Sequence, residues 1–284
     1  GCSITKGSSS SKLNGGDAIV NISGNPIIRT GSIGGGTTGA GQGKIGSAQI
    51  TISGGDIQAQ FVMMNTGTET KPKFEMSGGT IRNSYVDDEE YIHIKKQGGA
   101  VYLEDGTFTM SGGTIKNCSA VQGGAVYIAR KSTQPMEEGQ FNFKMEGGEI
   151  HSCFATGGVI DGENNDEPYL GHGGAVCLNG GQIHMWGGKI WNNYSENGDG
   201  GAVYISNGNF FMKNLSRILT HNYPTITGNA AHKGNGGGVF VSSENGKSVK
   251  VDLLQGIITN NTANNYGGGI CVDMGDTENS ATVT

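Results

Sequence analysis

Two acidic stretches carry the residues of this sequence that are best suited to chemistry. One is YVDDEEYIHIKKQ, residues 85–97, and the other is FATGGVIDGENNDEPYLGH, residues 154–172. Their carboxylates are Asp87, Asp88, Glu89 and Glu90 in the first stretch and Asp161, Glu163, Asp166 and Glu167 in the second. Calcium prefers oxygen ligands, which makes Asp161, Glu163 and Asp166 weak calcium candidates. The DGENNDE stretch lacks the spacing of a known calcium loop, so we favour solvated acidic loops and expect no cofactor.

The other reactive side chains form no catalytic or metal-binding pattern. The six histidines show neither HxH nor HExxH spacing, and no GxSxG or P-loop motif is present. The five cysteines, which include no CxxC pair, are Cys2, Cys118, Cys153, Cys177 and Cys271. A disulfide or metal pair at Cys118 and Cys153 is the minor alternative. Small buried side chains that fill a turn are the favoured interpretation, because free cysteine is commonly buried.

Short repeated segments must position these residues. Each copy of the repeat has a GGAVYL-type segment, then an FxMxGG-type segment, then an isoleucine with a short polar run. The first type begins at Gly98, Gly123, Gly173, Gly200, Gly236 and Gly267, and the second at Ile50, Phe74, Phe108, Phe143, Ile183 and, in degenerate form, Val249. The isoleucines of the third type are Ile81, Ile115, Ile150, Ile190, Ile226 and Ile258. Each segment is too short for a helix and alternates with the two-residue period of a strand.

This order predicts an all-β fold, a right-handed single-stranded parallel β-helix of about 7–8 coils with three short strands each. Glycine pairs are expected to end the strands, where the chain turns through positive φ. Equivalent apolar residues should stack inside. The outward column is expected to contain Glu75, Thr109, Lys144, His184, Phe211 and Lys250. At a polar corner, Asn193, Asn229 and Asn261 should stack and hydrogen-bond, with Cys118 and Cys153 at the same position.

A column of tyrosines offers a candidate binding face. Alternation places Tyr102, Tyr127 and Tyr204 opposite the core residues, in line with Cys177, Phe240 and Cys271. An exposed row of aromatic rings could hold a sugar or a partner protein. Because cysteine and phenylalanine occupy part of the column, partial cover by the insertions is the favoured interpretation.

Composition and charge narrow the function classes. Glycine contributes 53 of 284 residues, and hydrophobic residues only 34%, which favours a thin elongated core. The net charge of −6 argues against nucleic acid and against charge-driven binding to anionic lipid. No run approaches the ~18–20 apolar residues of a membrane span. The opening GCSITKGSSSS resembles a mature bacterial lipoprotein, with Cys2 lipidated behind a remnant Gly1; an ordinary disordered N-terminus is the alternative.

These signals predict a domain organisation. Residues 1–16 form a flexible tether, and residues 17–284 form the β-helix, with an irregular cap at 17–49. The closing SATVT resembles the start of a further strand, so the last coil is expected to be truncated, with further coils or a capping partner beyond it.

The repeat resembles a known family. GGA[IV] motifs alternating with [FI]xxN motifs, here Ile190–Asn193, Ile226–Asn229 and Ile258–Asn261, are similar to the repeats of bacterial polymorphic outer membrane proteins and related adhesin passengers. The likeness covers roughly residues 50–272, although the earlier copies replace the asparagine by Ser84, Cys118 and Cys153. It implies an adhesin-like protein of the bacterial cell surface or outer membrane. A family autotransporter would also carry a C-terminal membrane barrel, so membrane attachment would here rest on a lipid at Cys2.

The sequence therefore predicts a non-enzymatic, adhesin-like binding protein whose partner is a host or matrix protein or a glycan. One alternative is a polysaccharide lyase or glycoside hydrolase, which needs paired carboxylates or a base among acidic calcium ligands. The outward columns change chemistry at every step and do not offer that set. The other alternative is a purely structural stalk.

Overall fold

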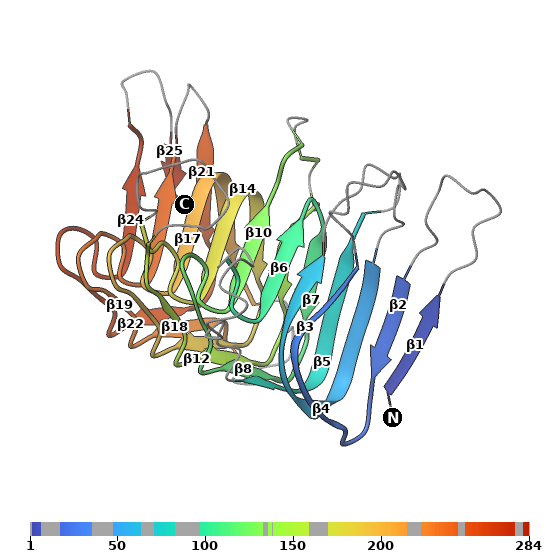
Figure 1. Cartoon of the computed structure of the whole chain (residues 1–284). Helices are drawn as coiled ribbons and strands as arrows, with labels where there is room; N and C mark the ends of the chain where they lie inside the picture. The colour runs from blue at the N-terminus through green and yellow to red at the C-terminus, as the bar shows by residue number, and fades with distance from the viewer. Residues whose placement is uncertain are drawn as a thin grey trace.

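The computed structural model of the chain is an all-β molecule built largely of parallel strands. It describes residues 2–6, 18–35, 48–63, 71–82, 97–132, 136–137, 139–158, 170–214, 223–243, 248–275 and 281–283. These residues form 25 strands and no helix. Figure 1 shows equivalent strands side by side, from the blue N-terminal end of the stack to the red C-terminal end.

The strands form three walls and a short corner sheet. The first wall contains part of β4 (Ala48–Met63), then β6 (Val101–Glu104), β10 (Val126–Ala129), the first half of β14 (Val176–Met185) and of β17 (Val203–Met212), β20 (Val239–Ser242) and β24 (Ile270–Asp273). The second wall contains β2 (Ala18–Ile22), β5 (Lys73–Arg82), β7 (Thr107–Met110), β11 (Phe143–Met145), β21 (Val249–Leu253) and β25 (Ala281–Val283), together with the remaining parts of β4, β14 and β17.

The third wall contains β3 (Ile27–Gly35), β8 (Thr114–Lys116), β12 (Glu149–His151), β15 (Lys189–Trp191), β18 (Thr225–Thr227) and β22 (Ile257–Thr259), and parts of β4 and β5. The corner sheet contains β9 (Ser119–Ala120), β13 (Phe154–Ala155), β16 (Tyr194–Ser195), β19 (Ala230–Ala231) and β23 (Thr262–Ala263). Strand β1 (Cys2–Lys6) pairs antiparallel with β2. The corner sheet was not predicted, because two-residue strands leave no alternation in the sequence.

Equivalent residues of successive copies pair directly, as the repeat predicts. Val126 faces Val101 on one side and Val176 on the other, and Ile150 lies likewise between Ile115 and Ile190. A shift of one residue would exchange the buried and exposed faces of a strand, so the apolar columns enforce this register.

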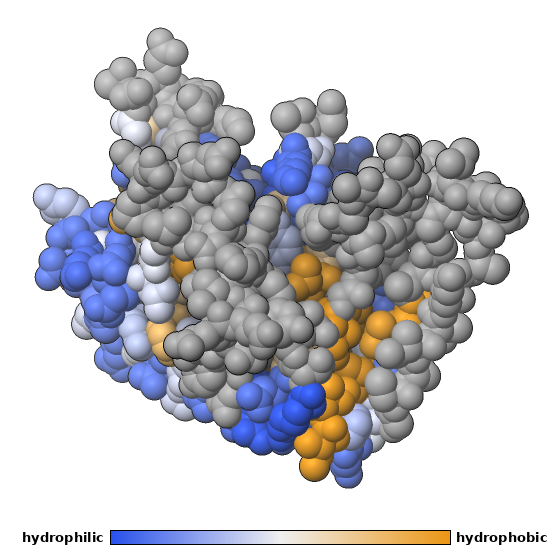
Figure 2. All heavy atoms as spheres, in the orientation of Figure 1, coloured by the Kyte–Doolittle hydropathy of each residue, from blue (hydrophilic) through white to orange (hydrophobic). Residues whose placement is uncertain are grey.

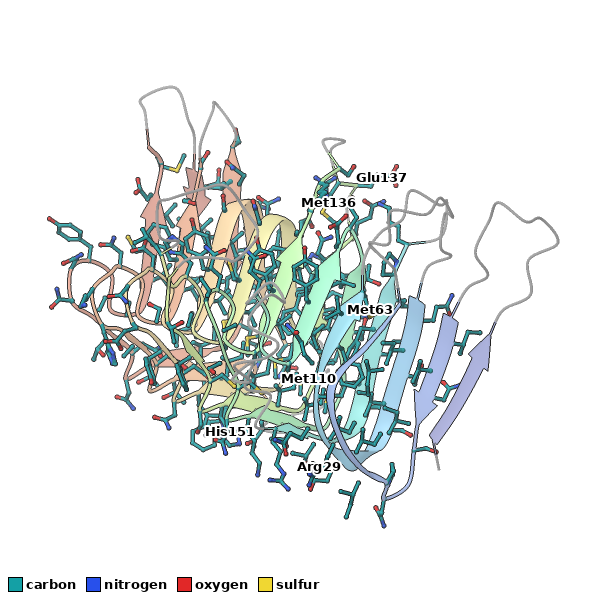
Figure 3. All side chains as sticks on the ribbon, viewed as in Figure 1. Arg29, Met63, Met110, Met136, Glu137 and His151 are labelled. Atoms are coloured by element: carbon teal, nitrogen blue, oxygen red, sulfur yellow. The ribbon has the colours of Figure 1, made fainter. Side chains whose placement is uncertain are left out.

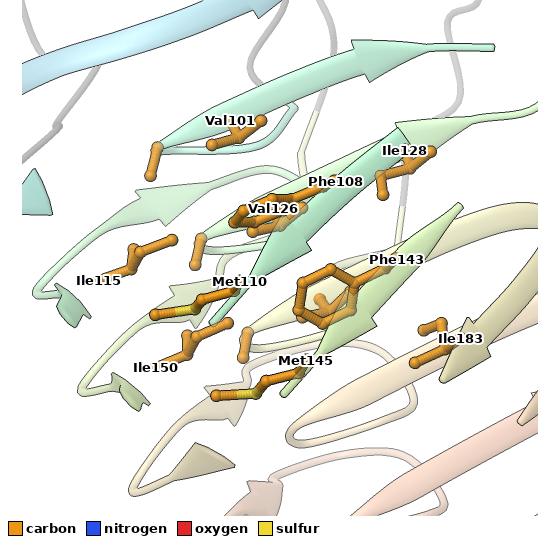
Figure 4. Close-up of a cluster of buried hydrophobic side chains, with 14 of the residues drawn as sticks. Val101, Phe108, Met110, Ile115, Val126, Ile128, Phe143, Met145, Ile150 and Ile183 are labelled. Carbon is orange, nitrogen blue, oxygen red and sulfur yellow. The ribbon is translucent and has the colours of Figure 1, made fainter. Parts of the chain in front are cut away.

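The core is a set of stacked apolar columns between the walls (Figure 4). Phe74, Phe108 and Phe143 are fully buried, and their ring centroids lie 4.9 and 5.0 Å apart. Met110 and Met145 line the next column inside the same two strands, β7 and β11. Burial of one such side chain contributes about 1.5–3 kcal/mol, so many modest contributions along the stack stabilise a thin core.

The expected open right-handed β-helix with three separate strands per coil is wrong. Strands β4, β5, β14 and β17 run from one wall into the next, and the three walls belong to one 20-stranded sheet. This sheet closes around the core as a parallel β-barrel with seven strands in the first wall. The glycine pairs explain the difference. Gly55 and Gly79 take positive φ inside β4 and β5, so they bend a strand that they were expected to end.

Glycine is also required where neighbouring copies approach closely. In the Gly200–Gly201 pair, Gly200 has a φ of 70°. A Cβ on Gly201 would overlap the backbone of Gly237 and Ala230 in the next copy. The GG of the GGAV motif therefore has two different causes, a left-handed turn and a close backbone contact.

The asparagine column forms the predicted ladder. Asn193 Nδ2 donates to Asn229 Oδ1 at 3.0 Å, and Asn229 Nδ2 donates to Asn261 Oδ1 at 2.9 Å. The backbone N–H of Asn193 also donates to Asn229 Oδ1, and that of Cys153 to Asn193 Oδ1. Asn193 and Asn229 are buried, so the ladder satisfies polar groups at a corner that water does not reach.

The predicted N-terminal tether and cap are only partly described by the structure. The range 17–49 contains β2 and β3, which pair in parallel with β4, while most of the range 1–16 lies outside the described residues. The division into tether and cap stays a prediction.

The predicted place of Lys250 beside Phe211 is wrong: Phe211 pairs with Asp252, and Lys250 pairs with Thr282, because Val251 rather than Val249 follows Phe210 in the core column.

Candidate binding surface around His184

The acidic residues predicted as ligands lie outside the described residues. These are Asp87, Asp88, Glu89, Glu90, Asp161, Glu163, Asp166 and Glu167. The calcium candidate Asp161, Glu163 and Asp166 therefore stays a prediction. Within the described residues, no three His, Cys, Asp or Glu side chains lie together as a metal site requires.

The predicted tyrosine column is largely covered. The rings of Tyr102 and Tyr127 stack with centroids 5.8 Å apart and pack with Cys177 in a cluster separate from the main core. Their exposed fractions of 8% and 6% leave little surface for a ligand. Burial, then the neighbouring Cys177, raises the pKa of the Tyr127 phenol above its ordinary value. Tyr204 is half-buried and stacks on Phe240 at 5.5 Å.

The cysteines of the polar corner are buried thiols. Cys118 and Cys153 are fully buried, and burial, with a hydrogen bond from the Cys118 side chain, raises the pKa of the Cys153 thiol. Their Sγ atoms donate to the carbonyls of Lys116 and His151. This arrangement supports the interpretation as small side chains that fill a turn. Cys2 lies in β1, and its lipidation stays a prediction.

A different group of side chains forms the candidate site, which we call the His184 cluster: Phe141, Lys144, His184, Trp186, Phe211 and Lys213. His184 lies in β14 between the core residues Ile183 and Met185, so strand alternation turns its side chain outward. It is nevertheless only 6% exposed. The rings of Phe211, Trp186 and Phe141 surround it, with centroids 5.0, 5.5 and 6.0 Å from that of the imidazole.

Two polar atoms in this cluster are buried without a partner. His184 Nε2 lies 3.2 Å from Gln182 Oε1. Because that oxygen can only accept, Nε2 carries the proton and Nδ1 presents a lone pair. Nδ1 has no hydrogen-bond partner among the described residues, and neither has the Trp186 Nε1–H, which is a donor. An unpaired buried polar group costs about 1–3 kcal/mol, so a pair of them beside each other calls for an explanation.

Lysine side chains add positive charge around these rings. Lys144 Nζ lies 4.8 Å from the Phe141 centroid and 5.3 Å from that of Trp186, and Lys213 Nζ lies 5.3 Å from Trp186. Lys144 also pairs with Glu146 at 3.1 Å, whereas Lys213 has no ion pair within the described residues. Burial, then Lys213 and Lys144, lowers the pKa of His184 to about 4, so the imidazole is neutral at physiological pH.

Chemically, the cluster combines aromatic surface, one acceptor, one donor and the ammonium group of Lys213, for which the described part of the chain supplies no carboxylate. Binding sites for small ligands and sugars are typically apolar surfaces with a few polar groups that fix orientation. This combination is suited to binding a ligand.

Sequence reasoning identified Lys144, His184 and Phe211 as outward but not as a site. The sequence does contain a signal for this site, at the position directly before each glycine pair. The equivalent residues at that position are Ser77, Ser111, Glu146 and Trp186. A tryptophan at a position that otherwise takes small or polar residues stands out from the repeat.

Two further aromatic rows occur on the outer face. His151 stacks on Trp191 at 4.3 Å on the third wall, and Phe154 stacks on Tyr194 at 5.1 Å in the corner sheet. Figure 3 shows His151 at the lower edge, away from the core residue Met110. In Figure 2, hydrophilic residues lie at the left and centre of the lower edge, and a stripe of hydrophobic residues reaches the edge beside them.

Comparison with known proteins adds no relative. No family model, curated protein or solved structure matches the chain. Within the ranges that the structure describes, no helix is long and apolar enough to cross a bilayer.

Proposed function

We propose that this chain is a non-enzymatic, adhesin-like binding protein of the bacterial cell surface. Its parallel sheet is a rigid scaffold that presents side chains to a glycan or to a host or matrix protein. The motif resemblance to the polymorphic outer membrane protein repeats motivates this proposal. In it, a lipid on Cys2 attaches the chain to the outer membrane, with the molecule facing outward.

The observation that carries the proposal is the His184 cluster. Aromatic rings, a neutral imidazole with a free lone pair and the ammonium group of Lys213, which has no ion pair among the described residues, lie together on an outer face. The aromatic side chains of this cluster present a broad apolar surface on the sheet, which favours recognition of an extended partner.

A binding screen tests the proposal. The purified chain is applied to a glycan array and to a panel of immobilised host matrix proteins, and the same polymers are assayed for reducing ends and unsaturated sugars. Reproducible, saturable binding without product release is the expected result. Product release would establish the polysaccharide-degrading alternative, and absence of binding throughout would leave the structural stalk.

A further inference from the structure

We infer that the His184 cluster binds an acidic polysaccharide, with one sugar hydroxyl bridging His184 Nδ1 and Trp186 Nε1. This inference rests on the proposed function and names the ligand class and the site. The first step is the pairing of the two orphaned atoms. One accepts a hydrogen bond and the other donates one. A hydroxyl group does both at once, whereas a carboxylate, an ammonium group or a carbonyl satisfies only one of them.

The second step concerns the rings. The Phe141 and Trp186 rings are half-buried, and that of Phe211 is also partly exposed. Pyranose rings present an apolar C–H face beside their hydroxyls, which matches an apolar surface around a polar pair. Aliphatic alcohols lack the ring face, and peptides lack the hydroxyl unless a particular side chain supplies it.

The third step concerns charge. The chain has a net charge of −6, yet the rings of this cluster carry lysine ammonium groups from the second wall: Lys144 lies in β11 on one side of β14, and Lys213 directly follows β17 on the other side. Lys144 pairs with Glu146, whereas no described carboxylate pairs with Lys213, so Lys213 is the ammonium group that we expect to attract an anion. A carboxylate on the sugar, as in a uronic acid, meets this requirement. A neutral polysaccharide leaves Lys213 without a role.

Entry of the hydroxyl requires movement of a ring, because both polar atoms are covered. The indole of Trp186 is the side chain that can move. It is half-buried, and its Nε1–H makes no hydrogen bond that would be broken. The tryptophan environment should therefore change when the ligand binds.

The chain contains two tryptophans, which allows a direct optical test. In a Trp191→Phe variant, Trp186 is the sole tryptophan and its fluorescence reports on the His184 cluster. Oligosaccharides of polygalacturonate, alginate and hyaluronan are titrated into this variant, with dextran oligosaccharides as the neutral probe. We expect a saturable change in emission with at least one acidic series and at least tenfold weaker binding of dextran.

The matched variant is Trp186→Phe, which keeps an aromatic ring and removes the donor. Loss of one buried hydrogen bond of about 1.4 kcal/mol corresponds to about tenfold weaker affinity by calorimetry. Lys213→Met should abolish the preference for acidic over neutral oligosaccharides. Circular dichroism and thermal melting check that both variants remain folded.

The outcomes separate this inference from the proposed function. Glycan or matrix binding that persists at full affinity in Trp186→Phe overturns the inference and leaves an adhesin with another site. If the Trp186 fluorescence changes with none of the oligosaccharides although the chain binds on the array, His184 Nδ1 and Trp186 Nε1 bind only water, and the inference is wrong. No binding to any glycan or matrix protein overturns both.

Discussion

At the residue scale, His184 links the candidate site to the stability of the fold. Its imidazole is buried against three rings, and its charged form is opposed by burial and by Lys213 and Lys144. The nearest carboxylate further along the wall is Asp252 in β21, two strands from β14, and it pairs with Lys250 at 2.7 Å. The folded chain therefore keeps this histidine neutral over a pH range in which the unfolded chain protonates it.

This difference predicts a pH dependence of stability. The pKa of His184 is about 4 when folded and about 6.5 when unfolded, so protons bind the unfolded state preferentially between those values. The free energy of unfolding should fall as the pH falls from about 6.5 to 4, by at most about 3 kcal/mol from this group. Urea denaturation at pH 7, 5.5 and 4 measures it.

In His184→Gln this contribution should disappear, so the variant and the wild type should respond differently to acid. His232→Gln is the control, because His232 is exposed beside Glu196. An identical pH response of wild type and His184→Gln would show that His184 is hydrated in solution.

The residue patterns predicted which way a side chain points better than they predicted which other side chains it contacts. Two-residue alternation correctly placed His184 outward and Ile183 inward. It could not show that Trp186, two residues further on, folds back over the imidazole, because that contact depends on the bend at the following glycine pair. The error at Lys250 has a related cause: Val249 and Val251 both fit the core column, and only pairing with β17 decides between them.

At the scale of elements, the asparagine ladder connects successive copies by hydrogen bonds at one corner of the molecule. Asn229 Oδ1 accepts from the backbone N–H and the Nδ2 of Asn193, while its own Nδ2 donates to Asn261 Oδ1 and to the carbonyl of Thr227. One side chain thus serves three consecutive copies. The spacing of the asparagines was visible in the sequence, so this part of the fold was predictable.

Asn229→Ala should therefore be strongly destabilising. The change leaves a buried N–H and a buried amide of Asn193 without their acceptor, at a cost of about 2–4 kcal/mol. Chemical denaturation measures it, with Asn264→Ala as the control on an exposed asparagine of the next turn. Equal stability of the two variants would mean that water replaces the ladder at this corner.

The effect of the glycine pairs on the strands could not be predicted from the sequence. Their left-handed conformation was anticipated, but whether such a pair stops a strand or bends it depends on the hydrogen bonds of the next copy. In β14 the chain continues from the first wall into the second through Gly180 and Gly181, both at positive φ. The sheet is continuous there because β17 repeats the same bend beside it.

At the scale of the whole molecule, closure of one sheet around stacked columns explains how a chain with so little apolar sequence folds. Each residue of the core contacts its equivalents in the copies before and after it, and 41 buried residues form one cluster. Composition and periodicity indicated a thin core and parallel pairing. They could not indicate how the walls join, because that is decided at corners where the sequence contains only glycine and small polar residues.

In-register stacking has a consequence for how the length of the molecule can change. Val203 pairs with Val239, 36 residues further on, and the ladder asparagines that precede these two strands, Asn193 and Asn229, have the same separation. Excision of residues 203–238 joins Ala202 to Val239 and returns every column to a matching partner. We expect this shortened chain to fold, with far-UV circular dichroism and cooperative melting like those of the parent.

Excision of one residue fewer, 203–237, would leave Gly238 at a valine position and exchange the inner and outer faces beyond the junction. That chain should not fold, and equal folding of the two would contradict the argument. We therefore expect the length of the molecule to change only by whole repeats: insertion or deletion of a complete repeat should leave the chain able to fold, and insertion or deletion of a single residue should not.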